Sequence, residues 1–333
     1  MKKYITVIKY PLLLAAIFLF ASCGEKQDQN ISKPLYELKA NSNIPKFDVD
    51  NAYNQVKAQV DFGPRNPGSR GHYEELLYLE RELKKYADTV VAQEFNYSGY
   101  DNEQLKLTNV IAKYNPSAKD RIILCAHWDT RPRSDHDPDP KKRDLPILGA
   151  NDGASGVGIL LEVARLLKNQ KVNYGIDLVF FDGEDYGKES DLDNFCLGSK
   201  YYAANYKNPN LPAFGILLDL VGDKDASFAE EGNSLRYARD VVNMVWGIAS
   251  QINANMFKQT EGETIYDDHI PLNQAGLRTI DIIDAELVGA NTPVKRRNYW
   301  HTQGDTMENI GKNALQQVGD VITHLIYSLK FNS

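Results

Sequence analysis

Acidic and histidine side chains follow several apolar segments of this chain, where they could bind a metal ion and move protons. The most informative stretch is Phe181-Asp182-Gly183-Glu184-Asp185, in which an apolar segment is followed by two adjacent carboxylates. Adjacent side chains point in different directions in extended backbone, so one acid could bind a metal while the other carries a proton. The rest of the chain must supply the other ligands of that metal.

Other acids and histidines recur after apolar segments along the sequence. They are His127 and Asp129, Asp152, Asp219, Asp267 with Asp268 and His269, and finally His301. Asp152 stands in a glycine-rich turn, residues 149–156, whose small residues let the backbone approach a bound group. A phosphate cradle is the alternative for such a turn, but the Walker lysine is absent and the dinucleotide spacing does not fit. We therefore interpret Asp152 as a metal ligand.

Imidazole and carboxylate donors together favour zinc, which in a catalytic site needs three protein ligands and an open position. Asp152, Asp185 and His301 would make such a set, with Glu184 left as the proton carrier. A lone acid at a strand end is more often a helix cap or turn former, and His301 alone is equally consistent with a structural histidine. The set is preferred because the structural alternative needs many coincidences at once.

Strand-like and helix-like segments alternate through most of the chain. Strands are predicted at residues 89–97, 105–114, 121–127, 176–181, 213–218 and 279–283. Helices are predicted from residue 51 and at residues 72–86, 154–168, 199–206, 235–253 and 313–329. This order predicts an α/β fold: a single domain with a mixed, mostly parallel sheet flanked by helices on both faces. The strands at 89–97 and 105–114 should form a hairpin or meander, and the charged segment 131–145 a surface loop near the site.

The first residues differ from the rest of the chain, which is 42% hydrophobic and 25% charged over 333 residues. Three lysines and an apolar run over residues 11–20, too short to span a membrane, predict a signal peptide at residues 1–22. Phe20-Ala21-Ser22-Cys23 resembles a bacterial lipobox, with ordinary cleavage near Ala21 as the alternative. Residues 23–45 are then a lipidated, flexible tether and 46–333 the catalytic domain. We expect export to the bacterial cell envelope or periplasm, with membrane contact through the lipid on Cys23 alone.

Charge and cysteine content restrict the partners and the covalent state of the exported part. Residues 1–22 contain three lysines and no acids, so their removal changes the net charge from −7 to −10. This charge argues against a nucleic-acid partner. A disulfide between Cys125 and Cys196 is permitted outside the cytoplasm, but Cys125, in an apolar strand, is equally consistent with a buried thiol. The chain is expected to be a monomer.

As an ordered set, these residues resemble the zinc aminopeptidase fold of the M28 family. The likeness rests on Phe62-Gly63-Pro64-Arg65, His127-Trp128-Asp129, Asn151-Asp152-Gly153-Ala154-Ser155-Gly156, Glu184-Asp185, Asp219 and His301-Thr302. Two chemistries share these positions in that family. One is hydrolysis of N-terminal residues by a di-zinc aminopeptidase, and the other is cyclisation of N-terminal glutamine to pyroglutamate by a one-zinc glutaminyl cyclase, which releases ammonia.

Four segments resemble glutaminyl cyclases in particular, including those of the bacterial type. They are Tyr299-Trp300-His301-Thr302, Asp267-Asp268-His269-Ile270-Pro271, Leu217-Leu218-Asp219-Leu220-Val221-Gly222 and Phe180-Phe181-Asp182-Gly183-Glu184. The resemblance implies one zinc per chain on Asp152, Asp185 and His301, a proton carrier at Glu184, and Trp300 in the substrate pocket. It also implies that Asp219 bonds to Glu184 and Asp267, with protons shared among the three. The implied substrates are peptides and proteins with N-terminal glutamine, and acceptance of glutamate is left open.

Three features keep alternatives open. Animal cyclases carry glutamate where Asp185 stands, so a shorter side chain must reach the metal here. His127 and Asp219 would suffice for a second zinc, with Asp129 as a further candidate near the metals, so the aminopeptidase alternative remains. Asp281 either accepts a hydrogen bond from His301 or is a strand-end acid that faces water. A metal-free binding protein of this fold is a third class, but it gives no reason for an intact ligand set.

Overall fold

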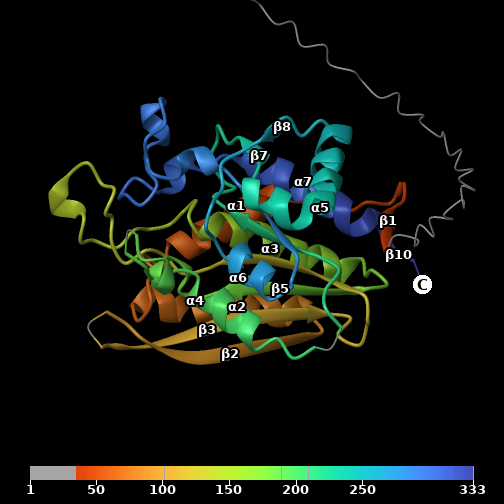
Figure 1. Ribbon diagram of the computed structural model, residues 1–333, viewed down its shortest axis with the longest axis horizontal. Coiled ribbons are helices and arrows are strands. Elements are labelled where there is room, and N and C mark those ends of the chain that lie inside the picture. The colour runs from red at the N-terminus through yellow and green to blue at the C-terminus, as the bar shows by residue number, and fades with distance from the viewer. Residues whose placement is uncertain (1–34, 101, 189, 209, 333) are drawn as a thin grey trace, which may run out of the picture. The chain divides into compact units, whose positions relative to one another are not determined.

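A mixed sheet of six strands forms the centre of the computed structural model, which describes residues 35–332 without 101, 189 and 209. The strands lie in the order β2 (Thr89–Ser98), β3 (Gln104–Tyr114), β5 (Gly175–Phe181), β4 (Arg121–His127), β6 (Gly215–Asp219) and β9 (Thr279–Ile283). The β2–β3 and β3–β5 pairs are antiparallel, and the other three are parallel. The predicted sheet and its hairpin are therefore confirmed (Figure 1).

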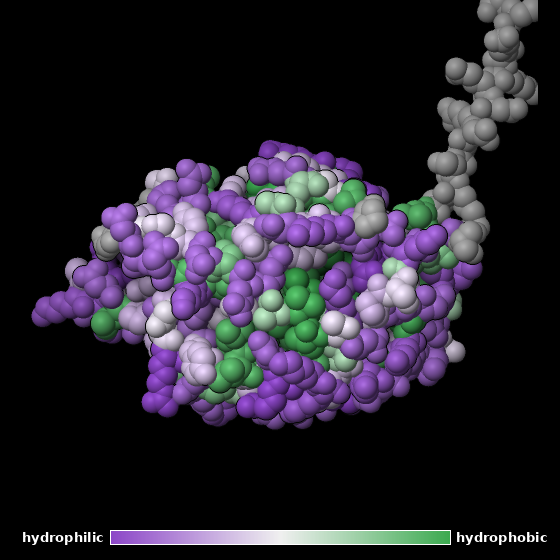
Figure 2. Space-filling model, turned by 90° about the horizontal axis from the view of Figure 1, so that it is seen from below, coloured by the Kyte–Doolittle hydropathy of each residue, from purple (hydrophilic) through white to green (hydrophobic). Residues whose placement is uncertain are grey.

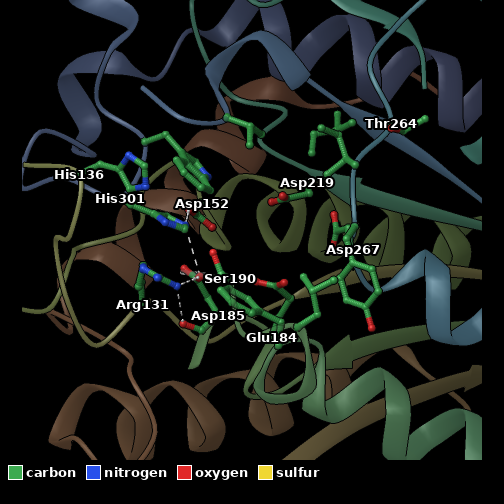
Figure 3. A pocket seen from close by; sticks show the side chains of 17 residues that line it. Arg131, His136, Asp152, Glu184, Asp185, Ser190, Asp219, Thr264, Asp267 and His301 are labelled. Atoms are coloured by element: carbon green, nitrogen blue, oxygen red, sulfur yellow. Dashed lines mark hydrogen bonds and ion pairs between the residues drawn. The ribbon is translucent and has the colours of Figure 1, made fainter. Parts of the chain in front are cut away.

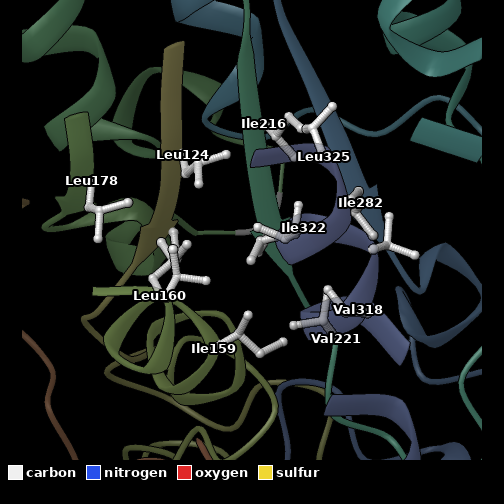
Figure 4. Packing of buried hydrophobic residues seen from close by; sticks show 14 of the residues in the cluster. Leu124, Ile159, Leu160, Leu178, Ile216, Val221, Ile282, Val318, Ile322 and Leu325 are labelled. Atoms are coloured by element: carbon white, nitrogen blue, oxygen red, sulfur yellow. The ribbon is translucent and has the colours of Figure 1, made fainter. Parts of the chain in front are cut away.

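Helices cover both faces of this sheet, as predicted. One face packs against α1 (Val49–Val60), α2 (Arg70–Tyr86), α3 (Ala154–Asn169), α5 (Gly232–Gln251) and α7 (Lys312–Ser328), and the other against α4 (Leu197–Ala204) and α6 (His269–Gln274). Strand alternation assigns the side chains to these faces. Leu124 of β4 packs toward α3 and α7, whereas Ile123 and Cys125 belong to the cluster with α4 and α6 (Figure 4).

The glycine-rich turn before α3 is set by close backbone packing. Gly153 has φ 96°, a conformation that favours glycine, and a Cβ there would lie 2.7 Å from the carbonyl oxygen of Asp129. No other residue type fits at this position without displacing the end of β4. The turn therefore brings Asp152 against the segment that follows β4, which is where the predicted metal ligands are needed.

Several elements differ from the prediction. β1 (Tyr36–Leu38) pairs with β10 (Leu329–Phe331), so residues predicted as tether join the folded unit, which begins at Leu35. Sequence patterns also missed β7 (Phe228–Glu230), β8 (Phe257–Glu261) and α6, since elements of three to six residues are too short for a clear periodicity. Six short 3-10 helices complete the described chain: Pro140–Lys142, Glu184–Tyr186 (η2), Leu192–Asn194, Ala285–Leu287, Lys295–Arg297 and Met307–Asn309.

The surface and the cysteines bear on the earlier expectations. No helix within residues 35–332 is both long and apolar enough to cross a bilayer. The face in Figure 2 is mostly hydrophilic, with apolar residues gathered toward its middle. Cys125 and Cys196 are buried free thiols, so the optional disulfide does not form. The predicted signal peptide and Cys23 lie outside the described residues.

Candidate active site

The predicted residues meet at the edge of the sheet where the parallel strands β5, β4, β6 and β9 have their carboxyl ends, the usual ligand-binding edge of α/β folds. A pocket of about 290 Å³ opens there (Figure 3). Its lining includes seven predicted site residues: Asp152, Glu184, Asp185, Asp219, Asp267, Trp300 and His301. The other three, His127, Asp129 and Asp281, are buried and do not line the pocket.

Asp152, Asp185 and His301 form a group of donor atoms with the spacing of a metal site. His301 Nε2 lies 3.5 Å from Asp152 Oδ2 and 3.3 Å from Asp185 Oδ1. Donors about 2 Å from a tetrahedral zinc are separated by roughly 3.3 Å. The buried Oδ2 atoms of Asp152 and Asp185 have no hydrogen-bond partner among the described residues. Both the spacing and these unpaired atoms fit a zinc ion.

A second donor group shares Asp152 with the first. His127 Nε2 lies 3.2 Å from Asp152 Oδ1 and 3.2 Å from Asp219 Oδ1. Burial alone would lower the pKa of His127, but hydrogen bonds with Asp129, Asp152 and Asp219 outweigh it and raise the pKa well above its ordinary value. Without a second metal, a protonated His127 can therefore neutralise charge between these carboxylates.

Asp185 reaches the donor group despite being one methylene shorter than glutamate. The Nη1 atom of Arg131 donates to its Oδ1 at 2.8 Å, and Arg131 is in turn bonded to Asp135. Burial would raise the pKa of Asp185, but its interactions with His301 and with the Arg131 guanidinium outweigh it and hold the pKa below its ordinary value. Arg131 thus fixes an ionised carboxylate whose other oxygen is unpaired. The segment 131–145 was correctly placed near the site, but this buried arginine was missed.

Glu184 is held at the start of η2 by its backbone rather than by the metal group. Asp129 Oδ1 accepts the N–H of Glu184 at 3.0 Å, and Asp129 Oδ2 accepts that of Asp185 at 3.3 Å. Burial and the charge of Asp185 raise the pKa of Glu184 well above its ordinary value. A half-buried carboxyl that takes up protons readily and lines the pocket suits a proton carrier. Asp129 therefore supports the turn and belongs to none of the donor groups found among the described residues.

The expected triad of Glu184, Asp219 and Asp267 shares one pocket but is connected differently. Asp219 Oδ1 contacts His127 and accepts the N–H of Leu220 at 2.7 Å. Burial and the charge of Asp219 raise the pKa of Asp267 to about 6. Asp281 lies beside Asp267, with donor atoms within 4.8 Å, and its own pKa is raised well above normal by burial and by the charge of Asp267.

Both alternatives for Asp281 were wrong. Asp281 is fully buried, so it does not face water, and its histidine neighbour is His269, with Nδ1 3.8 Å from Asp281 Oδ2. The physical reason is the register of β9, which pairs Asp281 with Leu217 in the interior of the sheet. Asp281 thus lies two residues before the end of β9 and on the face covered by α6. The acid nearest Nδ1 of His301 is instead Asp135, at 3.8 Å.

Trp300 forms an aromatic wall beside the metal group. Its ring stacks on that of His301 with centroids 3.4 Å apart and an interplanar angle of 19°. His136, a pocket residue that sequence patterns did not reveal, packs edge-on against Trp300 at 4.8 Å. Burial lowers the pKa of His301 to about 4, so the ring is neutral at pH 7, the form that binds metals.

Two further residues position Asp152. The carboxylate of Asp305 accepts the N–H groups of Asn151 at 2.9 Å and Asp152 at 3.0 Å. Arg65 is fully buried and donates to the carbonyl oxygen of Gly149 at 2.8 Å. Asp305 was missed because it lies in an aperiodic loop. Arg65 stands in the Phe62-Gly63-Pro64-Arg65 motif, which was the signal available in the sequence.

A family model described as Peptidase family M28 matches residues 109–326. The chain belongs to this family. Its solved relatives include a glutaminyl cyclase of Bacteroides thetaiotaomicron bound to N-acetylhistamine, 43% identical with a TM-score of 0.81, covering 86% of this chain and 99% of that one. A leucine aminopeptidase precursor from Bacteroides thetaiotaomicron VPI-5482 is also 43% identical, with a TM-score of 0.80 and coverage of 86% and 98%.

Curated relatives of this M28 chain include proteins with both kinds of name. The glutaminyl-peptide cyclotransferase of Bos taurus is 22% identical over 293 residues, which are 78% of this chain and 76% of that protein. Aminopeptidase YwaD of Bacillus subtilis is 28% identical over 220 residues, 62% of this chain but only 41% of that protein. The relatives are enzymes, and a solved Zn-dependent exopeptidase of Parabacteroides distasonis is among them at 40% identity. The chain is thus an M28 enzyme whose donor groups fit zinc.

Proposed function

We propose that this enzyme cyclises the N-terminal glutamine of peptides and proteins to pyroglutamate, with release of ammonia and one zinc per chain. The observation that carries the proposal is the stack of Trp300 on His301 at the wall of a pocket that also contains Glu184. A small aromatic-walled pocket can hold one side chain in a bent conformation, which an intramolecular attack requires. Solved relatives named as glutaminyl cyclases, 40–43% identical, support it.

The residues divide the work in the proposed reaction. A zinc bound to Asp152, Asp185 and His301 would polarise the γ-carbonyl of the substrate glutamine. Glu184 accepts a proton from the attacking α-amine and returns it to the leaving amide nitrogen, so that the new ring C–N bond forms as ammonia departs. Its raised pKa suits both transfers. Trp300 and the other apolar walls limit water, which would otherwise compete with the amine.

A di-zinc aminopeptidase is the second candidate, favoured by a specific observation. His127, Asp152 and Asp219 also have the spacing of a metal site, so these residues could hold a second zinc, and Asp152 belongs to both donor groups. In that case Glu184 would activate water instead of an amine. The same carboxylates are satisfied by a protonated His127 in the one-zinc enzyme.

Mass analysis of products separates the two candidates. A peptide beginning with glutamine that loses about 17 Da has released ammonia, whereas loss of its first residue means hydrolysis. A metal-polarised carbonyl can undergo either reaction. The proposal expects the first product and one zinc per chain by elemental analysis. Two zincs with a free amino acid as product would contradict it, and a peptide beginning with alanine serves as the substrate control.

We also propose that the chain is exported and lipidated at Cys23 in a bacterial cell envelope. The support is the lysine-flanked apolar run of residues 11–20 and the segment Phe20-Ala21-Ser22-Cys23. Labelled fatty acid should enter the full-length chain and not its Cys23→Ala variant. Equal labelling of the two would refute lipidation at this residue.

A further inference from the structure

A buried thiol lies directly beside the proposed proton carrier. Cys196 caps the start of α4 with φ 55° and ψ 37°, the left-handed conformation that few residues other than glycine adopt. Its Sγ lies 3.5 Å from Glu184 Oε1, and its N–H donates to the carbonyl oxygen of Glu184 at 2.8 Å. Cys196 has no exposed surface. Glu184 lines the pocket and Cys196 does not, so the thiol contacts the carboxylate from within the protein.

Asp267 completes a third donor group with these two residues. The donor atoms of Glu184, Cys196 and Asp267 all lie within 4.8 Å of one another. Asp267 is 4% exposed, and its Oδ2 has no hydrogen-bond donor among the described residues. This group shares no residue with Asp152, Asp185 and His301, nor with the His127 group.

The geometry matches a thiolate-containing metal site. With Zn–S of about 2.3 Å and Zn–O of about 2.1 Å, tetrahedral ligation separates sulfur from oxygen by roughly 3.6 Å. The observed separation between Cys196 Sγ and Glu184 Oε1 is 3.5 Å. One sulfur and two carboxylates are three of the four ligands of a tetrahedral ion, and a thiolate selects thiophilic cations such as Zn²⁺ and Cd²⁺ over Mg²⁺ and Ca²⁺.

We propose that Glu184, Cys196 and Asp267 form an inhibitory site for a second thiophilic divalent cation, separate from the catalytic zinc. Binding replaces the thiol proton, which passes to solvent, and engages the carboxylate of Glu184. Because that proton must be displaced, the affinity of the site for the cation falls as the pH falls. The inhibition rests on the proposed function of Glu184, whereas the binding itself does not.

Cadmium titration of the enzyme that already holds one zinc tests this site. A cadmium–thiolate bond gives ultraviolet charge-transfer absorption, which binding to carboxylates and imidazoles does not. We expect the band to grow to one cadmium per chain while turnover falls by at least tenfold. The band should disappear in Cys196→Ala, and it should persist in Cys125→Ala, the matched control for loss of a buried thiol. Circular dichroism and retained zinc establish that both variants are folded.

Four results would overturn the proposal. Three concern the band: no band in the unaltered enzyme, a band that survives in Cys196→Ala, or a band without loss of turnover. The fourth is inhibition that is equally strong in Cys196→Ala, which would place the cation on the His127 group instead. If the one-zinc enzyme releases no ammonia from glutamine peptides, the proposed function fails, yet the band still reports on cation binding. The two failures are therefore distinguishable.

Discussion

Replacing Glu184 by glutamine removes the proton carrier while keeping its size and its backbone contacts. The hydrogen bonds that Asp129 accepts come from the backbone N–H groups of residues 184 and 185 and not from the Glu184 side chain, so the turn should persist. Glu184 is not among the donors Asp152, Asp185 and His301, so bound zinc should remain at the unaltered level. The loss should therefore fall on the chemical step and appear in kcat, with little change in KM.

The size of the fall in kcat depends on whether a neighbouring carboxyl could replace Glu184. General acid–base catalysis contributes roughly 10² to 10⁴-fold. Asp219 contacts His127, and Asp267 lies beside the buried Asp281, so neither carboxylate occupies the position of the Glu184 carboxylate. This favours the upper part of the range. We expect kcat for Glu184→Gln to fall by about 10³-fold or more, a barrier increase of roughly 4 kcal/mol.

A coupled assay of ammonia release from a glutamine peptide, with zinc measured in the same samples, checks this expectation. Glu263→Gln, the same chemical change at an exposed acid beside the pocket loop, is the control and should keep its activity. A fall in kcat of less than tenfold would refute the role of Glu184. A large fall accompanied by lost zinc would show that Glu184 acts as a ligand instead.

Three other changes give separate tests. Asp185→Glu adds a methylene at a buried position that Arg131 already fixes, and the overpacking should cost about 1–3 kcal/mol. Zinc binding, measured by chelator competition, should therefore weaken roughly tenfold, and an equal zinc affinity would contradict this expectation. Trp300→Ala removes the ring stacked on His301 and should raise KM for glutamine peptides about tenfold with a smaller change in kcat, whereas an unchanged KM would remove Trp300 from the pocket wall. Burial raises the pKa of Glu75 from 4.5 to about 8, because the folded protein disfavours the charged carboxylate. The free energy of unfolding therefore falls as the pH rises from about 4.5 to about 8. In urea unfolding, Glu75→Gln should have the same free energy of unfolding as the unaltered chain near pH 4.5 and one about 4 kcal/mol higher at pH 9. Equal stabilities at pH 9 would contradict the expected direction of the effect.

The sheet and the first layer of the site could be predicted because both follow from local patterns. Apolar strands that end in or are soon followed by an acid place those side chains at one edge of a parallel sheet, and Glu184, Asp185 and Asp219 do line the pocket there. Arg131, Asp305 and Cys196 could not be found this way. They reach the site from loops or from a helix cap, whose paths are set by tertiary packing rather than by periodicity.

Asp281 shows the complementary failure, in which a local pattern was visible but its position in the sheet was not. An acid inside an apolar strand was correctly identified as unusual. Its partner depended on the register between β6 and β9, which pairs Asp281 with Leu217 and directs it toward Asp267 and His269. Sequence alone gives the alternation along β9 but not how far β9 slides past β6. The partner of Asp281 therefore required the structure.

The adjacent acids Glu184 and Asp185 are distinguished by their surroundings rather than by their sequence. Both N–H groups are held by Asp129, and the turn sends the two side chains into opposite electrostatic environments. Asp185 meets His301 and Arg131, which lower its pKa, whereas partial burial and nearby carboxylates raise the pKa of Glu184. Two acids whose pKa values are pushed apart can take different roles at one pH. The same arrangement that keeps Asp185 ionised as a ligand therefore keeps Glu184 able to carry a proton.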